Sequence, residues 1–265
     1  MPELPEVEMA RRYLQATALH QTIRAAKVRD ERILAKVSAR ELEEGLAGKQ
    51  FHSASRHGKR LFLKLNDSLW LTLHLGLTGR LIYLESGAEE PRHTRLLVCF
   101  ENGHRLAFDD PRIFGEVGLT KSPAAFLVER KIGPDALLLE PDGFLEIMSG
   151  RNGLIKPALL NQNLVAGLGN LYADEALFQA GIFPKTRGLT MEQLIALYSS
   201  IQEVLKTALS TDADLSKLPD SYLLPHRHPG GTCPRDGALL RHEKIGGRTS
   251  YFCPEHQKRI MFDKK

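Results

Sequence analysis

Short apolar stretches recur between about residues 22 and 120, and turn residues separate them. The stretches read LFLKL, WLTLHLGL, RLLVCF and RLAFDD, and some alternate apolar with polar positions, which is typical of strands. Asn102 and Gly103 lie between the last two stretches, and this pair favours a tight hairpin turn. The pattern predicts several antiparallel strands that form a sandwich or a barrel.

Helical spacing appears before and after these strands. The stretch PEVEMARRYLQATAL begins with a proline and repeats apolar residues at Val7, Ala10, Tyr13 and Leu14. From about Phe144 the pattern is helical again, most clearly in TMEQLIALYSSIQEVLKTAL. In that stretch Thr190 and Gln193 have capping-box spacing, and one face carries the predicted core residues Leu194, Leu197, Ile201 and Leu205.

The composition indicates a soluble protein that is large enough for two modest domains. Of its 265 residues, 42% are hydrophobic and 26% are charged. No run of eighteen apolar residues exists, so we expect no membrane span, and the start does not read as a secretory signal. Three cysteines cannot build a disulfide framework, which favours a reducing cytoplasm.

Positive charge is concentrated at the C-terminal end of the chain. Residues 226–265 contain nine Lys and Arg against four Asp and Glu, a net charge of +5, so the remainder of the +4 chain carries −1. A basic module of this kind is typical of a phosphate-binding surface. A solvated tail has the same composition, and charge alone does not decide between the two interpretations.

The opening string MPELPEVE contains a candidate nucleophile. Removal of Met1 would give Pro2 a free secondary amine, and an α-amino group has a pKa of about 8, so a useful fraction is neutral. Such an amine can attack an electrophilic carbon and form an iminium, and Glu3 beside it can move protons. Taken alone, MPE favours the simpler explanation that Pro2 permits removal of the methionine.

The longer string MPELPEVE resembles the start of the formamidopyrimidine-DNA glycosylase and endonuclease VIII family. HLGLTGRL, DDPRIFG, KIGPDAL, IKPALLNQNLVAGLGNLYADEALFQAGIFP and GGRTSYFCPEHQK follow in the order of that family, so the resemblance covers nearly the whole chain. It implies an α+β fold. The expected parts are an N-terminal helix with an antiparallel β-sandwich (1–133), a helix-two-turn-helix domain (134–225) and a zinc-finger-like hairpin (226–265).

The resemblance also implies an activity, that of a bifunctional DNA glycosylase and AP lyase in base excision repair. A damaged nucleotide leaves the stack, Pro2 attacks C1′ of its sugar, and Glu3 acts as the acid–base residue. β- and then δ-elimination follow without any catalytic cofactor. Lys59 is expected to contact a phosphate next to the lesion and to take part in proton transfer. The implied partner is double-stranded DNA with oxidised bases or abasic sites, bound by a monomer in a bacterial cytoplasm.

Three residues match those that fill the gap left by the extruded base, namely Leu77, Arg112 and Phe114. Without the resemblance, Leu77 and Phe114 would be assigned to a core. The triad of Leu77, Arg112 and Phe114 resembles that of the formamidopyrimidine branch of the family, so formamidopyrimidines are the expected lesions. The segment LPDSYLLPHRHPGG is short where efficient 8-oxoguanine excisers carry a long lesion-capping loop. The short segment therefore disfavours efficient removal of 8-oxoguanine and leaves oxidised pyrimidines or bulky adducts as alternatives.

The resemblance makes Lys156, Asn170 and Arg248 phosphate ligands, and Lys258 and Arg259 fit the same basic face. The amides at the start of the helix that begins at Asn170 favour an anion. Asp174 and Glu175 are expected to complement the dipole of that helix and to have a structural role. Glu6 either caps the first helix or helps to position the sugar.

Most members of the family end in a zinc hairpin with the spacing C-x2-C-x16-C-x2-C. This chain keeps the spacing but replaces two thiols, which gives the candidate ligands Cys233, Asp236, Cys253 and His256 for one structural Zn²⁺. His228 or His242 is an alternative to Asp236. A hairpin without zinc, held by packing, is the rival interpretation.

Two other function classes compete with a glycosylase. A damaged-DNA binding protein without catalysis is disfavoured by the presence of Pro2, Glu3 and Lys59 together. A metal-dependent endonuclease would need a clustered set of carboxylates, which the sequence does not contain.

Overall fold

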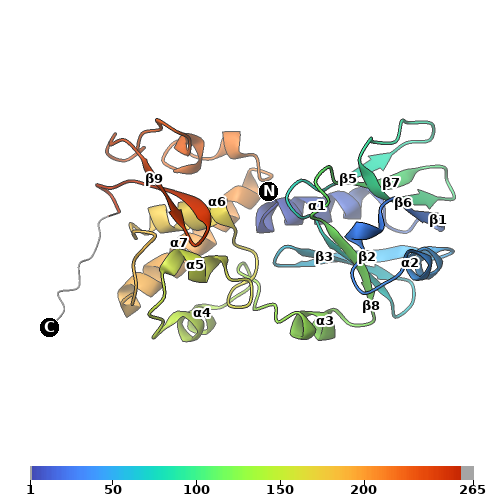
Figure 1. Ribbon diagram of the computed structural model, residues 1–265, viewed down its shortest axis with the longest axis horizontal. Helices are drawn as coiled ribbons and strands as arrows, with labels where there is room; N and C mark the ends of the chain where they lie inside the picture. Colours follow the sequence, from blue (N-terminus) through green and yellow to red (C-terminus); the bar gives the residue numbers. More distant parts are fainter. Residues whose placement is uncertain (1, 258–265) are drawn as a thin grey trace. The chain divides into compact units, whose positions relative to one another are not determined.

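The computed structural model describes residues 2–257 of the chain (Figure 1). It divides into two compact units, and the main parts of these units are residues 6–131 and residues 132 onward. Pro2 belongs to the first unit, whereas Glu3–Pro5 belongs to the second. The predicted three-part division remains a prediction, because the C-terminal hairpin clusters with the helices of the second unit. Within residues 2–257, no helix is both long and apolar enough to cross a membrane.

The first unit combines α1 (Leu4–Thr17), from Glu6 onward, with two antiparallel sheets. One sheet has the order β1-β6-β7-β5 and the other β2-β3-β4-β8. The strands are β1 (Ile23–Val28), β2 (Phe51–His57), β3 (Arg60–Leu65), β4 (Trp70–His74), β5 (Arg80–Leu84), β6 (Thr94–Phe100), β7 (Arg105–Asp109) and β8 (Glu116–Thr120). Apolar residues from both sheets share one core with Val7 and Leu14 of α1. The predicted sandwich is confirmed (Figure 1).

Local details of this unit follow from turn and capping chemistry. Asn102 and Gly103 do form the turn between β6 and β7, and Gly103 has a φ of 86° that suits glycine. Within the stretch WLTLHLGL, only the residues up to His74 form a strand. Three short helical elements, which the strand pattern did not predict, are η1 (Glu31–Ile33), α2 (Ala39–Leu46) and α3 (Pro123–Glu129). Ser38 and Glu41 form a capping box at α2, which was a readable signal.

The second unit is a helical bundle with a small hairpin. Its elements are α4 (Pro141–Met148), α5 (Ile155–Leu160), α6 (Asn170–Gln179), α7 (Met191–Ser210), η2 (Leu215–Lys217), η3 (Leu224–His226), β9 (Arg241–Ile245) and β10 (Arg248–Phe252). Thr190 and Gln193 form the predicted capping box of α7. The predicted apolar face of α7 is buried in one core with α4, α5, α6 and Leu4. The α+β fold class is confirmed.

Candidate active site and nucleic-acid interface

The Glu3 carboxylate is buried at the N-terminus of α6 in the second unit. It accepts hydrogen bonds from the backbone N–H groups of Gly169 (2.7 Å), Leu171 (2.8 Å) and Tyr172 (3.2 Å), and the residue is 0% exposed. The first amides of a helix have no partner inside the helix, and the helix dipole favours a negative charge at this end. Glu3 is therefore held in one position by the backbone amide of Gly169 and by two amides of the first turn of α6.

The glycines of the GLGN turn make room for the start of the chain. A Cβ on Gly169 would lie 2.3 Å from Cδ of Glu3, and one on Gly167 would lie 2.6 Å from Cδ1 of Leu4. Gly167 also has a φ of 120°, which favours glycine. Its carbonyl accepts a hydrogen bond from the Leu4 N–H at 3.1 Å. Close backbone approach at these two positions explains the glycine pair.

This arrangement answers one expectation from the sequence. The amides at the start of α6 were predicted to favour an anion, and the carboxylate of Glu3 takes those of Leu171 and Tyr172. The sequence did place an anion at this helix end, and that part of the reasoning is right. The anion belongs to the chain itself.

Pro2 lies in the first unit, beside a cavity of about 320 Å³. The cavity is lined on one side by residues of α1, including Glu6 and Met9, and on the other by Leu75 and Gly79. Glu6 is in the first turn of α1, as expected, and its side chain lines this cavity next to Pro2. A half-buried Pro2 at the edge of a cavity has space in front of it for a reactant.

Lys59 occupies the two-residue turn, Gly58–Lys59, that joins β2 to β3. Beyond the effect of burial, the positive charge of Lys59 lowers the pKa of His74, the last residue of β4. Burial lowers the pKa of His74 to about 4, and the positive charges of Arg60 and Lys59 add to this effect against the opposing charge of Glu116. His74 is therefore neutral at neutral pH. Its Nδ1 accepts a hydrogen bond from Gly76 N–H at 3.1 Å and fixes the start of the following loop.

His74 makes stability depend on pH. Its pKa falls from 6.5 when exposed to about 4 in the fold, so between these values the unfolded chain binds the proton and the folded chain does not. We expect the free energy of unfolding to drop by up to about 3 kcal/mol as the pH falls from 6.5 to 4. His74→Gln keeps an acceptor for Gly76 and should abolish this part of the drop in denaturant unfolding.

The exposed His52 provides the control for that experiment. His52→Gln makes the same substitution at an exposed histidine and controls for the exchange of an imidazole for an amide. If His74→Gln has the same acid sensitivity as the unaltered protein, the assignment to His74 is wrong.

The three predicted gap-filling residues lie on two neighbouring loops of the first unit. Leu77 is in the loop from β4 to β5, and Arg112 and Phe114 are in the loop from β7 to β8. The loops touch, because a Cβ on Gly76 (φ 63°) would lie 2.4 Å from the Phe114 carbonyl carbon. Phe114 is 54% exposed, and the Arg112 guanidinium lies 5.0 Å from the centre of its ring. Phe114 is therefore not a core residue, and its exposed ring is available for contact with a partner.

Asp110 holds these two loops together, and the sequence analysis did not single it out. Its side chain is buried and accepts hydrogen bonds from Thr78 Oγ1 and Gly115 N–H, each at 2.7 Å. The carboxylate thus bonds to one residue of each loop. Asp110 stands in the quoted motif DDPRIFG, so a readable signal existed.

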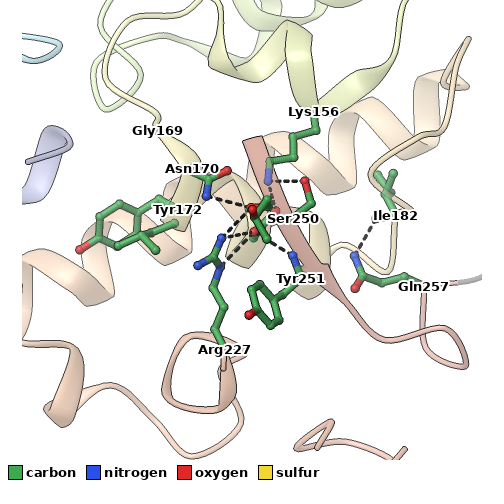
Figure 2. A network of polar contacts seen from close by, with 12 residues as sticks. Lys156, Gly169, Asn170, Tyr172, Ile182, Arg227, Ser250, Tyr251 and Gln257 are labelled. Carbon is green, nitrogen blue, oxygen red and sulfur yellow. Dashed lines mark hydrogen bonds and ion pairs between the residues drawn. The ribbon is translucent and has the colours of Figure 1, made fainter. Parts of the chain in front are cut away.

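Lys156 is enclosed within the second unit, and its role as a direct phosphate ligand stays a prediction. The residue is 0% exposed, and its Nζ donates to Asp174 Oδ1 at 2.5 Å and to Ser250 Oγ at 2.6 Å (Figure 2). Burial lowers the pKa of Lys156, while the charge of Asp174 opposes this. In this arrangement the Lys156 ammonium bonds to groups of the protein itself. The sequence motif identified Lys156, but the sequence pattern could not show that its partners are Asp174 and Ser250 of the protein itself.

Asp174 and Glu175 are structural, as expected, but they do not complement the helix dipole. Both carboxylates are buried past the first turn of α6, and burial raises the pKa of each. Glu175 accepts hydrogen bonds from the N–H groups of Leu223 (3.1 Å) and Leu224 (2.8 Å). They bind specific partners in the tertiary structure instead of complementing the helix dipole.

Arg248 and Asn170 lie near each other in the second unit. Arg248 is exposed at the first position of β10, directly after the turn formed by Gly246 and Gly247. Asn170 begins α6, and its Nδ2 donates to the carbonyl of Thr249 at 2.9 Å (Figure 2). The exposed position of Arg248 suits contact with a phosphate. Lys258 and Arg259 lie outside the described residues.

A cluster of possible metal ligands forms where predicted. One donor atom each from Cys233, Asp236 and Cys253 lies within 4.8 Å of the others. Two thiols and a carboxylate are a suitable donor set for zinc. Burial raises the pKa of the Cys253 thiol to about 12, and the thiol donates to Asp236 Oδ2 at 3.2 Å. Metal binding would have to displace this proton.

His256 does not join the cluster, which differs from the prediction. Its Nε2 donates to the carbonyl oxygen of Phe178 at 2.8 Å, and its ring packs against the Phe178 ring at 4.9 Å. The two alternatives to Asp236 are directed elsewhere as well. His242 stacks on Tyr251, and His228 has its Nδ1 against the carbonyl of Pro229. Among the described residues, three ligands are assembled.

Comparison with known proteins agrees with this geometry. Residues 1–117 match the formamidopyrimidine-DNA glycosylase N-terminal domain, and residues 132–220 match the formamidopyrimidine-DNA glycosylase H2TH domain. The chain belongs to the formamidopyrimidine-DNA glycosylase family. As a member of this family it is a DNA N-glycosylase with AP lyase activity that acts in base excision repair of oxidised bases.

Proteins of this family align with nearly the full length of this chain. A formamidopyrimidine-DNA glycosylase of Pelotomaculum thermopropionicum is 34% identical over 274 residues, which is 97% of this chain and 99% of that protein. One of Arabidopsis thaliana is 35% identical over 97% of this chain and 71% of that protein. A solved complex of Lactococcus lactis Fpg with DNA containing an abasic site has a TM-score of 0.88 at 31% identity, covering 97% of this chain and 100% of that one. A complex with DNA containing FAPY-dG has a TM-score of 0.87 at 30% identity with the same coverage.

Proposed function

We propose that this glycosylase excises oxidised bases through a covalent imine between Pro2 and the sugar, with Glu3 as the acid–base residue. The observation that carries the proposal is the fixed, buried carboxylate of Glu3, which three backbone amides hold directly next to Pro2 in the chain. A proton carrier adjacent to a secondary amine is the arrangement that iminium chemistry needs.

The proposed steps balance in bonds and protons. The nitrogen of Pro2 attacks C1′ and gives its N–H proton to the Glu3 carboxylate, while the bond between C1′ and the base breaks and the base leaves with that electron pair and takes a proton from water. Glu3 then passes its proton to the ring oxygen as the C1′–O4′ bond breaks and the sugar opens to the iminium. Loss of the acidified C2′ proton to water then expels the 3′ phosphate, a second elimination expels the 5′ phosphate, and water hydrolyses the imine and frees Pro2. No metal or organic cofactor enters any of these steps.

We infer that formamidopyrimidines are the main lesions. The relevant features are the assignment to this family and the grouping of Leu77, Arg112 and Phe114 on two touching loops. Leu77 and Phe114 would fill the space of the extruded nucleotide, and Arg112 would bond to the unpaired base. Complexes of Lactococcus lactis Fpg with DNA containing FAPY-dG and an oxidised pyrimidine make both lesions proper members of a substrate panel.

Binding of damaged duplex DNA is proposed for three polar residues, of which Arg248 is exposed and Lys59 and Asn170 are partly buried. Arg248 would contact phosphates from the hairpin, Asn170 from the start of α6, and Lys59 from the β2–β3 turn, next to the lesion. We further propose that one monomer acts on one lesion and that the protein works in the cytoplasm.

Trapping with borohydride tests the chemistry. Reduction during reaction with an abasic duplex should convert the imine into a stable link, so the protein band should shift by the mass of the DNA. Mass spectrometry of the digested adduct should place the link on the nitrogen of Pro2. Tight binding of the duplex without any trapped species would overturn the proposal and indicate a damaged-DNA binding protein. Activity that requires magnesium would instead indicate hydrolysis.

We propose a structural zinc ion held by Cys233, Asp236 and Cys253. Purified protein should contain about one zinc per chain, as a single compact ligand cluster implies. His256→Gln should leave the zinc content unchanged, because the ring bonds to Phe178. Cys253→Ser should remove the ion. Elemental analysis checks all three proteins, and zinc that disappears from a folded His256→Gln variant would show that the histidine is a ligand.

A further inference from the structure

Several segments of the second unit meet at the buried carboxylate of Asp174, which is 0% exposed. Its Oδ1 accepts from Lys156 Nζ of α5 at 2.5 Å. Its Oδ2 accepts from Arg227 Nε and Nη2, at 3.0 and 2.8 Å, and from the Tyr251 backbone N–H at 3.1 Å. Lys156 and Arg227 approach from opposite sides (Figure 2). One anion on α6 thus joins α5, the segment after η3 and β10.

The same group of residues fixes three consecutive positions of β10. Ser250 accepts a hydrogen bond from Lys156, and the Tyr251 N–H binds Asp174. The Thr249 carbonyl accepts from Asn170 Nδ2 at 2.9 Å and from Arg227 Nη2 at 3.0 Å. The Arg227 guanidinium also lies 4.9 Å from the centre of the Tyr251 ring. These three residues directly follow the exposed Arg248.

The buried ion pairs of Asp174 favour one placement of the β9–β10 hairpin on the helices. A buried ion pair gains little net stability, because desolvation of the charges offsets their attraction. Removing one partner is costly, however, since a charge then stays buried without compensation. Charge-assisted bonds with an arginine fork are also directional. Such a group selects one arrangement of the hairpin on the helices over others that bury similar apolar area.

We propose that Asp174 is a positioning residue for DNA binding. It holds β10 against α5 and α6, and so fixes Arg248 relative to the N-terminus of α6, where the Glu3 carboxylate is bound. The inference rests on the proposed phosphate contact of Arg248. Asp174 itself touches no DNA, since its side chain is fully buried. Loss of its charge should loosen β10 and misplace Arg248 while the helices stay folded.

A double-mutant cycle with Asp174→Asn and Arg248→Ala tests the proposal. The probe is a duplex with an uncleavable tetrahydrofuran abasic site, and affinity is measured over a range of salt. Arg248→Ala should weaken binding about tenfold and lower the salt slope by about one phosphate contact. Asp174→Asn should have a similar effect, and the double variant should be within about twofold of either single variant, since both remove one contact. Excision at saturating enzyme should change far less than KM.

Hydrogen exchange supplies a readout that does not depend on DNA. The Tyr251 amide and its β10 neighbours should exchange faster in Asp174→Asn, with α7 unchanged. Glu175→Gln is the matched control, because this equally buried carboxylate on the same helix bonds to Leu223, Leu224 and Gln179. It should leave affinity within about twofold of the unaltered protein. If Asp174→Asn does not fold, Ser250→Ala replaces it in the cycle, since it removes one bond to β10 and keeps the ion pairs.

Two kinds of result would overturn the proposal, and each refutes a different step of the argument. Effects that multiply to about a hundredfold in the double variant, or unchanged exchange in β10, would show that Asp174 does not act through Arg248. Unchanged affinity in Arg248→Ala would refute the assigned phosphate contact, and the present inference with it. In either case borohydride trapping of the unaltered protein still reports separately on the proposed chemistry.

Discussion

A chain that keeps any residue ahead of Pro2 is expected to excise no damaged base and to form no trapped adduct. An amide nitrogen in place of the amine has no available electron pair, so the covalent step cannot begin. The rate of excision should fall by roughly 10⁴-fold or more, as when the nucleophile of a covalent enzyme is removed. Single-turnover excision from a formamidopyrimidine duplex measures this loss.

The sharpest form of that experiment uses one preparation before and after removal of a cleavable N-terminal extension. Activity should return once cleavage exposes Pro2. Affinity for the tetrahydrofuran duplex should be similar in both forms, which shows that the extension does not simply block binding. Full-speed excision by the extended form would exclude Pro2 as the nucleophile.

Gly169→Ala is expected to slow excision by about 10²- to 10⁴-fold, the range that an acid–base residue contributes. The added Cβ would lie 2.3 Å from Glu3 Cδ, so the carboxylate must leave its three amides. The backbone is not the cause, because Gly169 has φ −125°, which alanine adopts readily. Single-turnover kinetics should show the loss, while affinity for the tetrahydrofuran duplex stays within a few-fold.

Two comparisons isolate the cause of that loss. Gly153→Ala adds a methyl where no atom lies within 4 Å and should leave the rate unchanged. Glu3→Gln should be impaired on its own, and adding Gly169→Ala should slow it by no more than about twofold, since both changes act on one carboxylate. Losses that multiply in the double variant would mean that Gly169 acts by another route.

Much of the fold was predictable because its signals are local. Strand alternation, the Asn102–Gly103 turn and the capping box at Thr190 each involve neighbours in the chain, and the structure confirms them. Helix α2 was missed within a region of strands, although Ser38 and Glu41 carried the same capping signal. The family resemblance, which depends on long motifs, identified the enzyme class.

The site was less predictable, because its key contacts join residues that are distant in sequence. Glu3 binds amides more than 160 residues away, and Lys156 meets Ser250 across 94 positions. Sequence spacing cannot show whether a lysine faces DNA or an internal carboxylate. The metal hairpin illustrates the same limit, since intact ligand spacing did not reveal that His256 would bond to the Phe178 carbonyl.

The chain's beginning is anchored in a way that most protein termini are not. Glu3 and Leu4 are both 0% exposed, and their partners belong to the helical unit, whereas ends of chains usually fray. Heat inactivation should therefore follow the melting of the helices around α6, even if the β-sandwich survives to higher temperature. We then expect the working lifetime of the enzyme to be set by a part of the molecule that contains neither Pro2 nor the two loops that carry Leu77, Arg112 and Phe114.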